Sequence, residues 1–352
     1  MHRTLRSLIL LGLLAAPGIS SALTSLCVSN SQQLASALQS VNAGADNLIL
    51  VKLRRGTYAP LDGGSGFTLD LTASGRVVEI SGGWTGAGSS CTHKNLSASG
   101  TLIVGDAGGS ALAFDLAAGS NTTLAISDLT ITTPGGGDGA CLYGEVRAAT
   151  TATVERVRLE RCISNSYSGS FRLVNSGGEA TVRNVVARGG SGTRTGGITV
   201  ESQAGITRLN HLSITANRAR QGGNPGGLYI NCLPPAEVYL GNSVIWGNVA
   251  GDTPNDIVNS GNCLAISHIR YGVRSGWGTA NSSSTGDPGF VAFGNPGPRS
   301  GSPLIDTGLA SVAGGPGSFD VDGLSRIQGG VADIGAHEGA YAGDEIFRDI
   351  QP

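Results

Sequence analysis

The sequence has few charged side chains and no run of residues of like charge. Only 14% of the 352 residues are charged, the net charge is −2, and just two of the 23 basic residues are lysines. The basic patch of a protein that binds nucleic acid or anionic membranes is therefore missing. The 57 glycines and 13 prolines are too many for a long-helix or coiled-coil protein. Because the glycines have no period of three, collagen is excluded as well.

The N-terminus is typical of a secretory signal. Arg3 and Arg6 precede an apolar run over residues 8–16, and the small residues 20–22 follow it. The run is shorter than the roughly 20 apolar residues of a transmembrane helix, and no later stretch is apolar enough to span a bilayer. We therefore expect residues 1–22 to be a signal peptide cleaved after Ala22. The chain would then be exported to the periplasm, the cell surface or the medium.

A motif of three apolar residues recurs about every 28 residues. Its first residue, called the anchor below, is Ile126, Val154, Val182, Leu209 and then Leu240, at spacings of 27 to 31 residues. Short strands between Gly, Ser and Asn turns at this period favour a coil of parallel strands. A leucine-rich repeat would have denser leucines, and a propeller blade would need roughly 40 to 50 residues.

Two further series support the repeat. A second strand motif runs in phase with the anchors and begins at Leu142, Phe171, Ile198 and Leu228. Weaker anchors extend the first series at Leu50, Val78, Ile103 and Ile266. The count predicts about nine coils.

The sequence thus predicts an all-β fold, a right-handed parallel β-helix over residues 23–285. Residues 29–31 followed by the amphipathic stretch 32–41 predict a capped helix over the first coil, because the open sheet end of such a rod must be covered. Residues 286–340 are expected to form a closing module, the C-terminal cap, and residues 341–352 a tail.

The six cysteines all follow the signal segment, and no two are separated by only two to four residues. This spacing gives little support to a zinc site, and an even number in an exported chain favours disulfides. The predicted pairs are Cys232–Cys263, which are one coil apart, then Cys141–Cys162 and, by elimination, Cys27–Cys91.

Two residues past each anchor, coil stacking would place Asp128, Arg156, Asn184, His211 and Asn242 in one column, called the corner column below. It is either a polar strip that binds a ligand or a ladder of turn residues bonded to their own backbone. We favour the ladder, because Asn and Asp form turns readily.

Arginines on successive coils are the candidate ligand-facing residues. Planar guanidinium groups suit bidentate recognition of uronate or phosphate. The alternative, which we favour, is a solvated face of the repeats. The candidates are Arg156, Arg158, Arg183 and Arg188, together with His211.

Four blocks stand near the C-terminus: DPGF at 287–290, SPLIDTG at 302–308, DVDGLSR at 320–326 and DIGAHE at 333–338. In this order they closely resemble the choice-of-anchor Q domain family of exported bacterial proteins, part of the pectate-lyase-like right-handed β-helix superfamily. SGGW at 81–84 also resembles the N-terminal coils of that family. The resemblance covers residues 24 to 340. It implies a β-helix body with a variable anchoring tail, and it implies no defined catalytic activity.

A polar network is expected to close the C-terminal coil. The start of a calcium loop at 320–323 lacks the rest of that loop, so a tight turn with Gly323 at positive φ is the favoured alternative. We predict neither a metal nor a cofactor. The network residues are Asp306, Asp320, Asp322, Arg326, Asp333 and Glu338.

The enzymatic signal is weak. A glycan lyase would need clustered carboxylates for calcium, and an inverting hydrolase two carboxylates roughly 6.5 to 9.5 Å apart, but the central coils hold few. No Ser or Cys stands in a nucleophile elbow. We assign no catalytic residue and predict a structural, adhesive or polysaccharide-binding module, with a polysaccharide or other cell-surface ligand and no nucleic acid as partner. The alternative is a polysaccharide lyase or hydrolase acting on acidic glycans.

Overall fold

The computed structural model describes residues 23–61, 66–106, 108–276, 280–292 and 294–339. The predicted signal peptide and tail lie outside these ranges. The described part contains one α-helix and a short 3-10 helix, and the rest of its regular structure is β. The elements are α1 (Ser31–Ser40), η1 (Ala98–Gly100) and the strands β1 (Leu23–Val28), β2 (Leu48–Arg54), β3 (Gly56–Tyr58), β4 (Phe67–Leu71), β5 (Val77–Thr85), β6 (His93–Lys94), β7 (Thr101–Val104), β8 (Leu112–Leu116), β9 (Thr123–Gly136), β10 (Leu142–Val146), β11 (Thr151–Ser164), β12 (Phe171–Arg188), β13 (Ser191–Gly192), β14 (Ile198–Thr215), β15 (Arg218–Ala219), β16 (Leu228–Cys232), β17 (Glu237–Trp246), β18 (Val249–Ala250), β19 (Thr253–Pro254), β20 (Ile257–Asn259), β21 (Leu264–Tyr271), β22 (Arg274–Gly276), β23 (Ala280–Asn281), β24 (Ser284–Thr285), β25 (Phe290–Ala292) and β26 (Asn295–Pro298).

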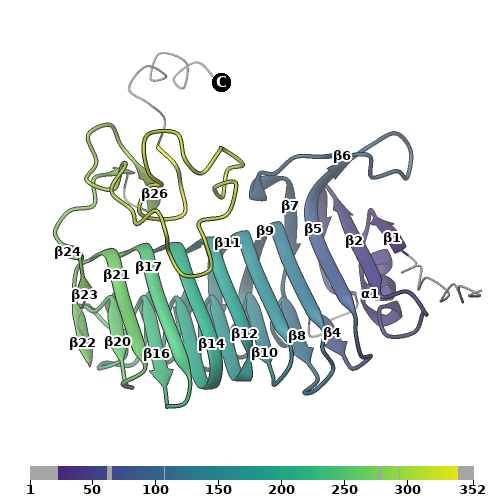
Figure 1. Ribbon diagram of the computed structural model, residues 1–352, viewed down its shortest axis with the longest axis horizontal. Helices are drawn as coiled ribbons and strands as arrows, with labels where there is room; N and C mark the ends of the chain where they lie inside the picture. The colour runs from purple at the N-terminus through teal and green to yellow at the C-terminus, as the bar shows by residue number, and fades with distance from the viewer. Residues whose placement is uncertain (1–22, 62–65, 107, 277–279, 293, 340–352) are drawn as a thin grey trace, which may run out of the picture.

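The chain winds as a right-handed parallel β-helix of about nine coils, as the sequence predicted (Figure 1). The central anchors stack in the expected register: Val154 pairs with Ile126 on one side and Val182 on the other. Leu209 and Leu240 continue the stack. A repeated apolar position therefore becomes one continuous row inside the rod.

The weaker anchors were only partly right. Ile266 pairs with Leu240 as expected. Before the central coils, however, Val51 and Ile80 occupy the row where Leu50 and Val78 were predicted. Ile103 pairs with Ile131 in the next part of the coil. A long excursion between Ile80 and Ile126 breaks the period there, so spacing alone could not fix the register. The row contains nine residues: Leu26, Val51, Ile80, Ile126, Val154, Val182, Leu209, Leu240 and Ile266.

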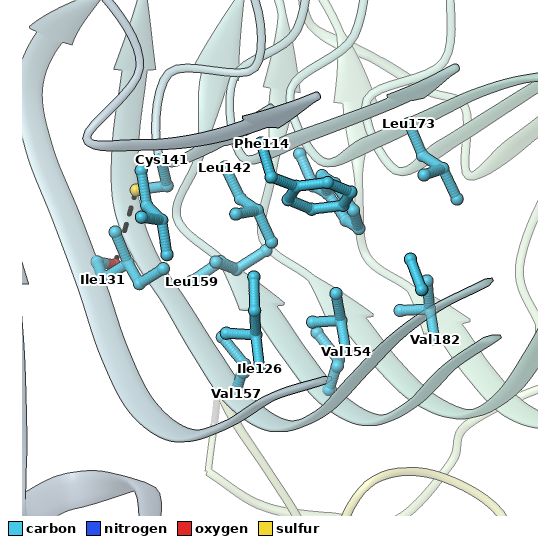
Figure 2. Close-up of a cluster of buried hydrophobic side chains, with 14 of the residues drawn as sticks. Phe114, Ile126, Ile131, Cys141, Leu142, Val154, Val157, Leu159, Leu173 and Val182 are labelled. Atoms are coloured by element: carbon cyan, nitrogen blue, oxygen red, sulfur yellow. Dashed lines mark hydrogen bonds between the residues drawn. The ribbon is translucent and has the colours of Figure 1, made fainter. Parts of the chain in front are cut away.

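Aliphatic side chains from neighbouring coils fill the interior (Figure 2). Every other residue of β10 points inward, as its alternating burial shows. Gly144 is one of these inward positions, and a Cβ there would lie 2.2 Å from the ring of Phe114 on the preceding coil. The missing side chain thus makes room for an aromatic ring in a core that is mostly Val, Ile and Leu.

Each central coil turns at the corner column. Its residues all adopt a left-handed conformation with φ between 45° and 61°. Asn and Asp tolerate this region better than most residues, which explains why they recur there. The left-handed backbone agrees with the favoured interpretation of the column as a turn ladder. The side chains of Asn184 and Asn242 bond to residues 309–319, however, and not to their own backbone as that interpretation expected. The column is Asp128, Arg156, Asn184, His211 and Asn242, and His268 extends it by one coil.

The capping helix lies where it was expected, as α1. The Asn30 side chain accepts a hydrogen bond from the Gln33 backbone N–H at 2.9 Å, and the Gln33 side chain accepts one from Ser29 N–H at 2.8 Å. Leu34 and Leu38 are buried on the face that the helix turns toward the first coils. The helix covers apolar interior that would otherwise be open at the N-terminal end of the rod (Figure 1).

The predicted C-terminal cap packs against the side of the rod. The described residues of 286–339, the C-terminal segment below, lie along the side of the rod beside β11, β14 and β17 (Figure 1). A small cluster joins Val321 and Ala336 of this segment to Ala98 and Val186 of the coils, and a second joins Leu304 and Ile334 to Val244. The expectation that this polar module closes the last coil is corrected accordingly: these contacts run along the flank.

The three disulfides join Cys27 to Cys91, Cys141 to Cys162 and Cys232 to Cys263, with Cα atoms 5.5 to 5.7 Å apart. These are the pairs expected from the sequence, and all six cysteines are used. Within the described ranges, none of the helices has the length and apolar character needed to cross a membrane.

Peptide mapping without reduction tests this pairing. Proteolysis of the purified chain should release three cross-linked peptide pairs with the connectivity above. A reduced and alkylated sample, in which each cysteine appears in a separate peptide, is the control. Other partners or alkylated free thiols in the non-reduced digest would contradict the structure.

Candidate functional site

The corner column lies beneath the C-terminal segment. Asn184 donates hydrogen bonds to the carbonyls of Pro316 and Phe319 at 2.9 and 3.0 Å. Asn242 donates to the Leu309 carbonyl at 2.9 Å and accepts from Leu309 N–H at 2.7 Å. The column therefore holds the C-terminal segment in place and is itself withdrawn from solvent.

This placement does not fit a ligand-facing role for two of the candidates. His211 is fully buried, and Arg156 is only 6% exposed. Arg156 makes a two-pronged contact with Asp128 on the preceding coil, at 2.7 and 3.2 Å. The positive charge of Arg156 is thus balanced by Asp128 inside the protein.

Arg183 and Arg188 stand on the outside but are also paired between coils, whereas Arg158 pairs with Asp322 of the C-terminal segment. Arg183 lies 2.6 Å from the Glu155 carboxylate, and Arg188 lies 3.1 Å from Glu160, each one coil away. The register of β11 with β12 places both partners directly opposite each other. Such pairs leave little uncompensated positive charge along the rod.

A polar pocket of about 500 Å³ lies between the coils and the C-terminal segment. Arg158 of β11 and Arg188 of β12 form one wall. Residues of the C-terminal segment form the other, among them Asp322 and His337. The size is ordinary for a small-ligand site. Two arginines predicted to face a ligand are therefore brought together with parts of two C-terminal blocks.

His337 is held by Asp322 in this pocket. Its Nδ1 lies 2.9 Å from Oδ2 of Asp322, whose other oxygen contacts Arg158. Burial raises the pKa of Asp322, but the hydrogen bond from His337 and the charge of Arg158 outweigh burial and hold that pKa well below its usual value. Asp322 is therefore an anion, and it accepts a hydrogen bond from the Nδ1–H group of His337. In the neutral ring Nε2 is then an acceptor.

Asp320, Asp322 and His337 lie close enough together to suggest a metal site. Their oxygens are already used, however. Oδ1 of Asp320 accepts from the N–H groups of Asp322 and Leu324, and its Oδ2 accepts from Glu338 N–H, at 2.8 to 2.9 Å. Gly323 has a φ of 84°, as the tight-turn alternative requires. The donor set fits a turn better than a bound cation.

Arg326 anchors the C-terminal segment to the rod. It is 1% exposed, contacts His211, and donates to the carbonyls of Asp333 and Gly335 at 2.6 Å. Its Nε lies 3.6 Å from the Glu338 carboxyl. Burial raises the pKa of Glu338 to about 8, although Arg326 lowers it. A buried cation thus joins the corner column to the last block of the sequence.

The predicted polar network is only partly buried. Asp320, Arg326, Asp333 and Glu338 are buried, whereas Asp306 and Asp322 are exposed. Asp306 remains attached to the group through its backbone N–H, which donates to Asp333 at 2.7 Å. Asp322 instead contacts Arg158 of β11 in the pocket.

Sequence reasoning missed two features. The first is the contact of His337 with Asp322: His337 lies in one of the four C-terminal blocks, but its partner is 15 residues earlier, and only folding brings them together.

The second missed feature is a stack of tyrosines and arginines on the sheet of β10, β12, β14 and β16, with guanidinium-to-ring distances of 4.5 to 5.9 Å. Loop residues interleave with strand residues there, which the period did not reveal. In order the stack is Tyr143, Arg172, Tyr167, Arg194 and Tyr229.

The stack is internally satisfied. Arg172 donates to Glu201 at 2.7 Å and to Asp138 at 2.6 Å, while guanidinium groups cover the ring of Tyr167. Cation–π contacts of this kind stabilise neighbouring coils. We therefore place the candidate site in the pocket, where Nε of Arg158 and Nε2 of His337 have no hydrogen-bond partner among the described residues.

Comparison with protein-family models, with curated proteins and with solved structures returned no match.

Arg326→Ala should destabilise the protein strongly. The substitution removes a buried cation that donates to the carbonyls of Asp333 and Gly335 and lies beside the Glu338 carboxyl group. Loss of one partner from a buried ionic contact typically costs about 3 to 5 kcal/mol. Thermal unfolding followed by circular dichroism measures it. Arg218→Ala is the matched control, since Arg218 pairs with an exposed Asp252 and such pairs contribute little. An unchanged melting curve for Arg326→Ala would show that the buried pair is not needed.

His211 should make the protein sensitive to acid. Burial, followed by the charge of Arg326, lowers its pKa well below the usual 6.5. Below pH 6.5 the unfolded chain therefore binds a proton that the folded protein does not, so stability falls as pH falls, by at most about 1.4 kcal/mol per pH unit.

His211→Asn tests this contribution, because Asn184 and Asn242 occupy the same corner on adjacent coils. Urea unfolding at pH 5 and pH 7.5 should show a smaller loss on acidification for the variant than for the unmodified chain. Equal losses would mean that His211 is not held neutral by the fold.

Proposed function

We propose that this chain is an exported surface protein, related to the choice-of-anchor Q domain family, that binds polysaccharide. The parallel β-helix and the three disulfides support a protein that works outside the cytoplasm. The predicted signal peptide at residues 1–22 and the order of the C-terminal blocks support the export and family assignments.

The pocket between β11, β12 and the C-terminal segment is the observation that carries the binding proposal. It places Arg158, Arg188 and His337 around one volume of about 500 Å³. Polar groups converging on a preformed hollow are typical of ligand sites. The long side of a solenoid also suits an extended partner.

A second candidate function is glycan cleavage, since the pocket contains two carboxyl groups and two arginines. Asp322 and Glu338 are those carboxyl groups. Both are engaged: Asp322 contacts His337 and Arg158, and Glu338 accepts from the N–H groups of Gln328 and Asp333 at 3.3 Å. A lyase or hydrolase would need a carboxylate free to bind calcium or to transfer a proton. We therefore favour binding.

A polysaccharide screen tests the proposal. The chain from Leu23 to Pro352 is incubated with neutral and acidic polysaccharides, with and without calcium, while binding and ultraviolet absorbance are followed. We expect binding without absorbance growth and without dependence on calcium. Replacement of both pocket arginines, Arg158→Ala with Arg188→Ala, should weaken that binding at least tenfold, and Arg218→Ala should leave it unchanged.

The outcomes separate the two functions. Calcium-dependent growth of absorbance would establish a lyase and overturn the binding proposal. Binding that survives the double substitution in a folded protein would move the site away from the pocket.

A further inference from the structure

The charges in the pocket are already neutralised by the protein. Arg158 contacts Asp322, and Arg188 lies 3.1 Å from Glu160. Glu338, the remaining carboxyl group, has a pKa of about 8 because it is buried, so it is mostly uncharged at neutral pH. An anionic ligand would have to compete with one of these carboxylates for its arginine, which lowers the net gain from its charge.

Two buried polar atoms in the pocket have no hydrogen-bond partner among the described residues. Nε of Arg158 is buried and has no hydrogen-bond partner among the described residues. Nε2 of His337, a side chain only 7% exposed, also has none there. Arg158 Nε–H is a donor. In the neutral imidazole whose Nδ1–H donates to Asp322, His337 Nε2 is an acceptor.

One donor and one acceptor at a neutral site match the hydroxyl group. A hydroxyl accepts a hydrogen bond from one partner and donates to another, whereas a carboxylate or phosphate only accepts when ionised. An anion would leave His337 Nε2 without a donor, and a buried polar atom left unpaired costs free energy. The pocket is also lined by Val291 and Pro298, whose apolar surface suits the C–H face of a ring.

We propose that this pocket binds an uncharged sugar residue through its hydroxyl groups, with Arg158 donating to one hydroxyl and His337 accepting from another. The inference rests on the proposed polysaccharide-binding function and narrows it to neutral glycans. Arg158 and Arg188 suggested an acidic ligand by their residue type. In this proposal Arg158 is a hydrogen-bond donor, and Arg188, whose charge is balanced by Glu160, lines the wall of the pocket.

Titration calorimetry with short glycans tests the inference. The chain from Leu23 to Pro352 is titrated at pH 7 with neutral oligomers of glucose, mannose, xylose and galactose, with oligomers of galacturonate and guluronate, and with glucose 6-phosphate. Each titration is run in 50 and 500 mM NaCl. At least one neutral oligomer should bind at least tenfold more tightly than the acidic ligands, with an affinity that changes less than twofold between the two salt concentrations.

Two variants at His337 locate the contact. His337→Ala removes the acceptor and should weaken the neutral ligand at least tenfold. His337→Gln keeps an oxygen that accepts and should recover much of the affinity. Thermal melting of both variants shows whether they fold, and Arg218→Ala, at a residue that does not line the pocket, should bind as the unmodified chain does.

Each other outcome has a distinct meaning. Tighter, salt-sensitive binding of a uronate or of the sugar phosphate would overturn the neutral-ligand inference and leave the binding function standing. Absence of binding by every glycan of the calorimetric set and of the polysaccharide screen would overturn the proposed function itself. Neutral binding that His337→Ala leaves unchanged in a folded protein would show that the ligand lies elsewhere.

Discussion

Every central coil must turn at the same point, and the left-handed residue at that point is the constraint on which the rest of the structure depends. Parallel strands stack only if successive coils have the same shape, so the backbone of Asn184, His211 and Asn242 repeats from coil to coil. A left-handed corner exposes side-chain and backbone polar groups that need partners. The C-terminal segment supplies these partners from its own carbonyls, as Asn184 and Asn242 show.

The candidate site is a consequence of this lateral docking. One wall is formed by strands after the corner, where Arg158 and Arg188 project outward. The other is formed by residues of the C-terminal segment, more than 100 residues later in the chain. Arg326 fixes the two walls relative to each other through His211. Stability and the shape of the pocket therefore depend on the same buried contacts.

The sequence was sufficient for the coils but not for the site. Val154, Val182 and Leu209 repeat at almost constant spacing, and a single period determines their register. The register failed at Leu50 and Val78, because a long excursion interrupts the period. The position of the C-terminal segment could not be predicted, since a periodic rod offers many similar surfaces. The contact of His337 with Asp322 and the burial of His211 both follow from that position, so the sequence could name candidates without bringing them together.

The lateral course of the C-terminal segment also changes how the rod should unfold. A simple solenoid is held by contacts between adjacent coils, so it can fray from its ends one coil at a time. Here the segment bonds to Asn184, Asn242 and, through Val321, Ala98, which lie on different coils. The segment therefore ties several coils together along the axis, and one coil can separate from the rod only if the segment also detaches from the others. The central coils are therefore expected to behave as one cooperative unit under heat or pulling force.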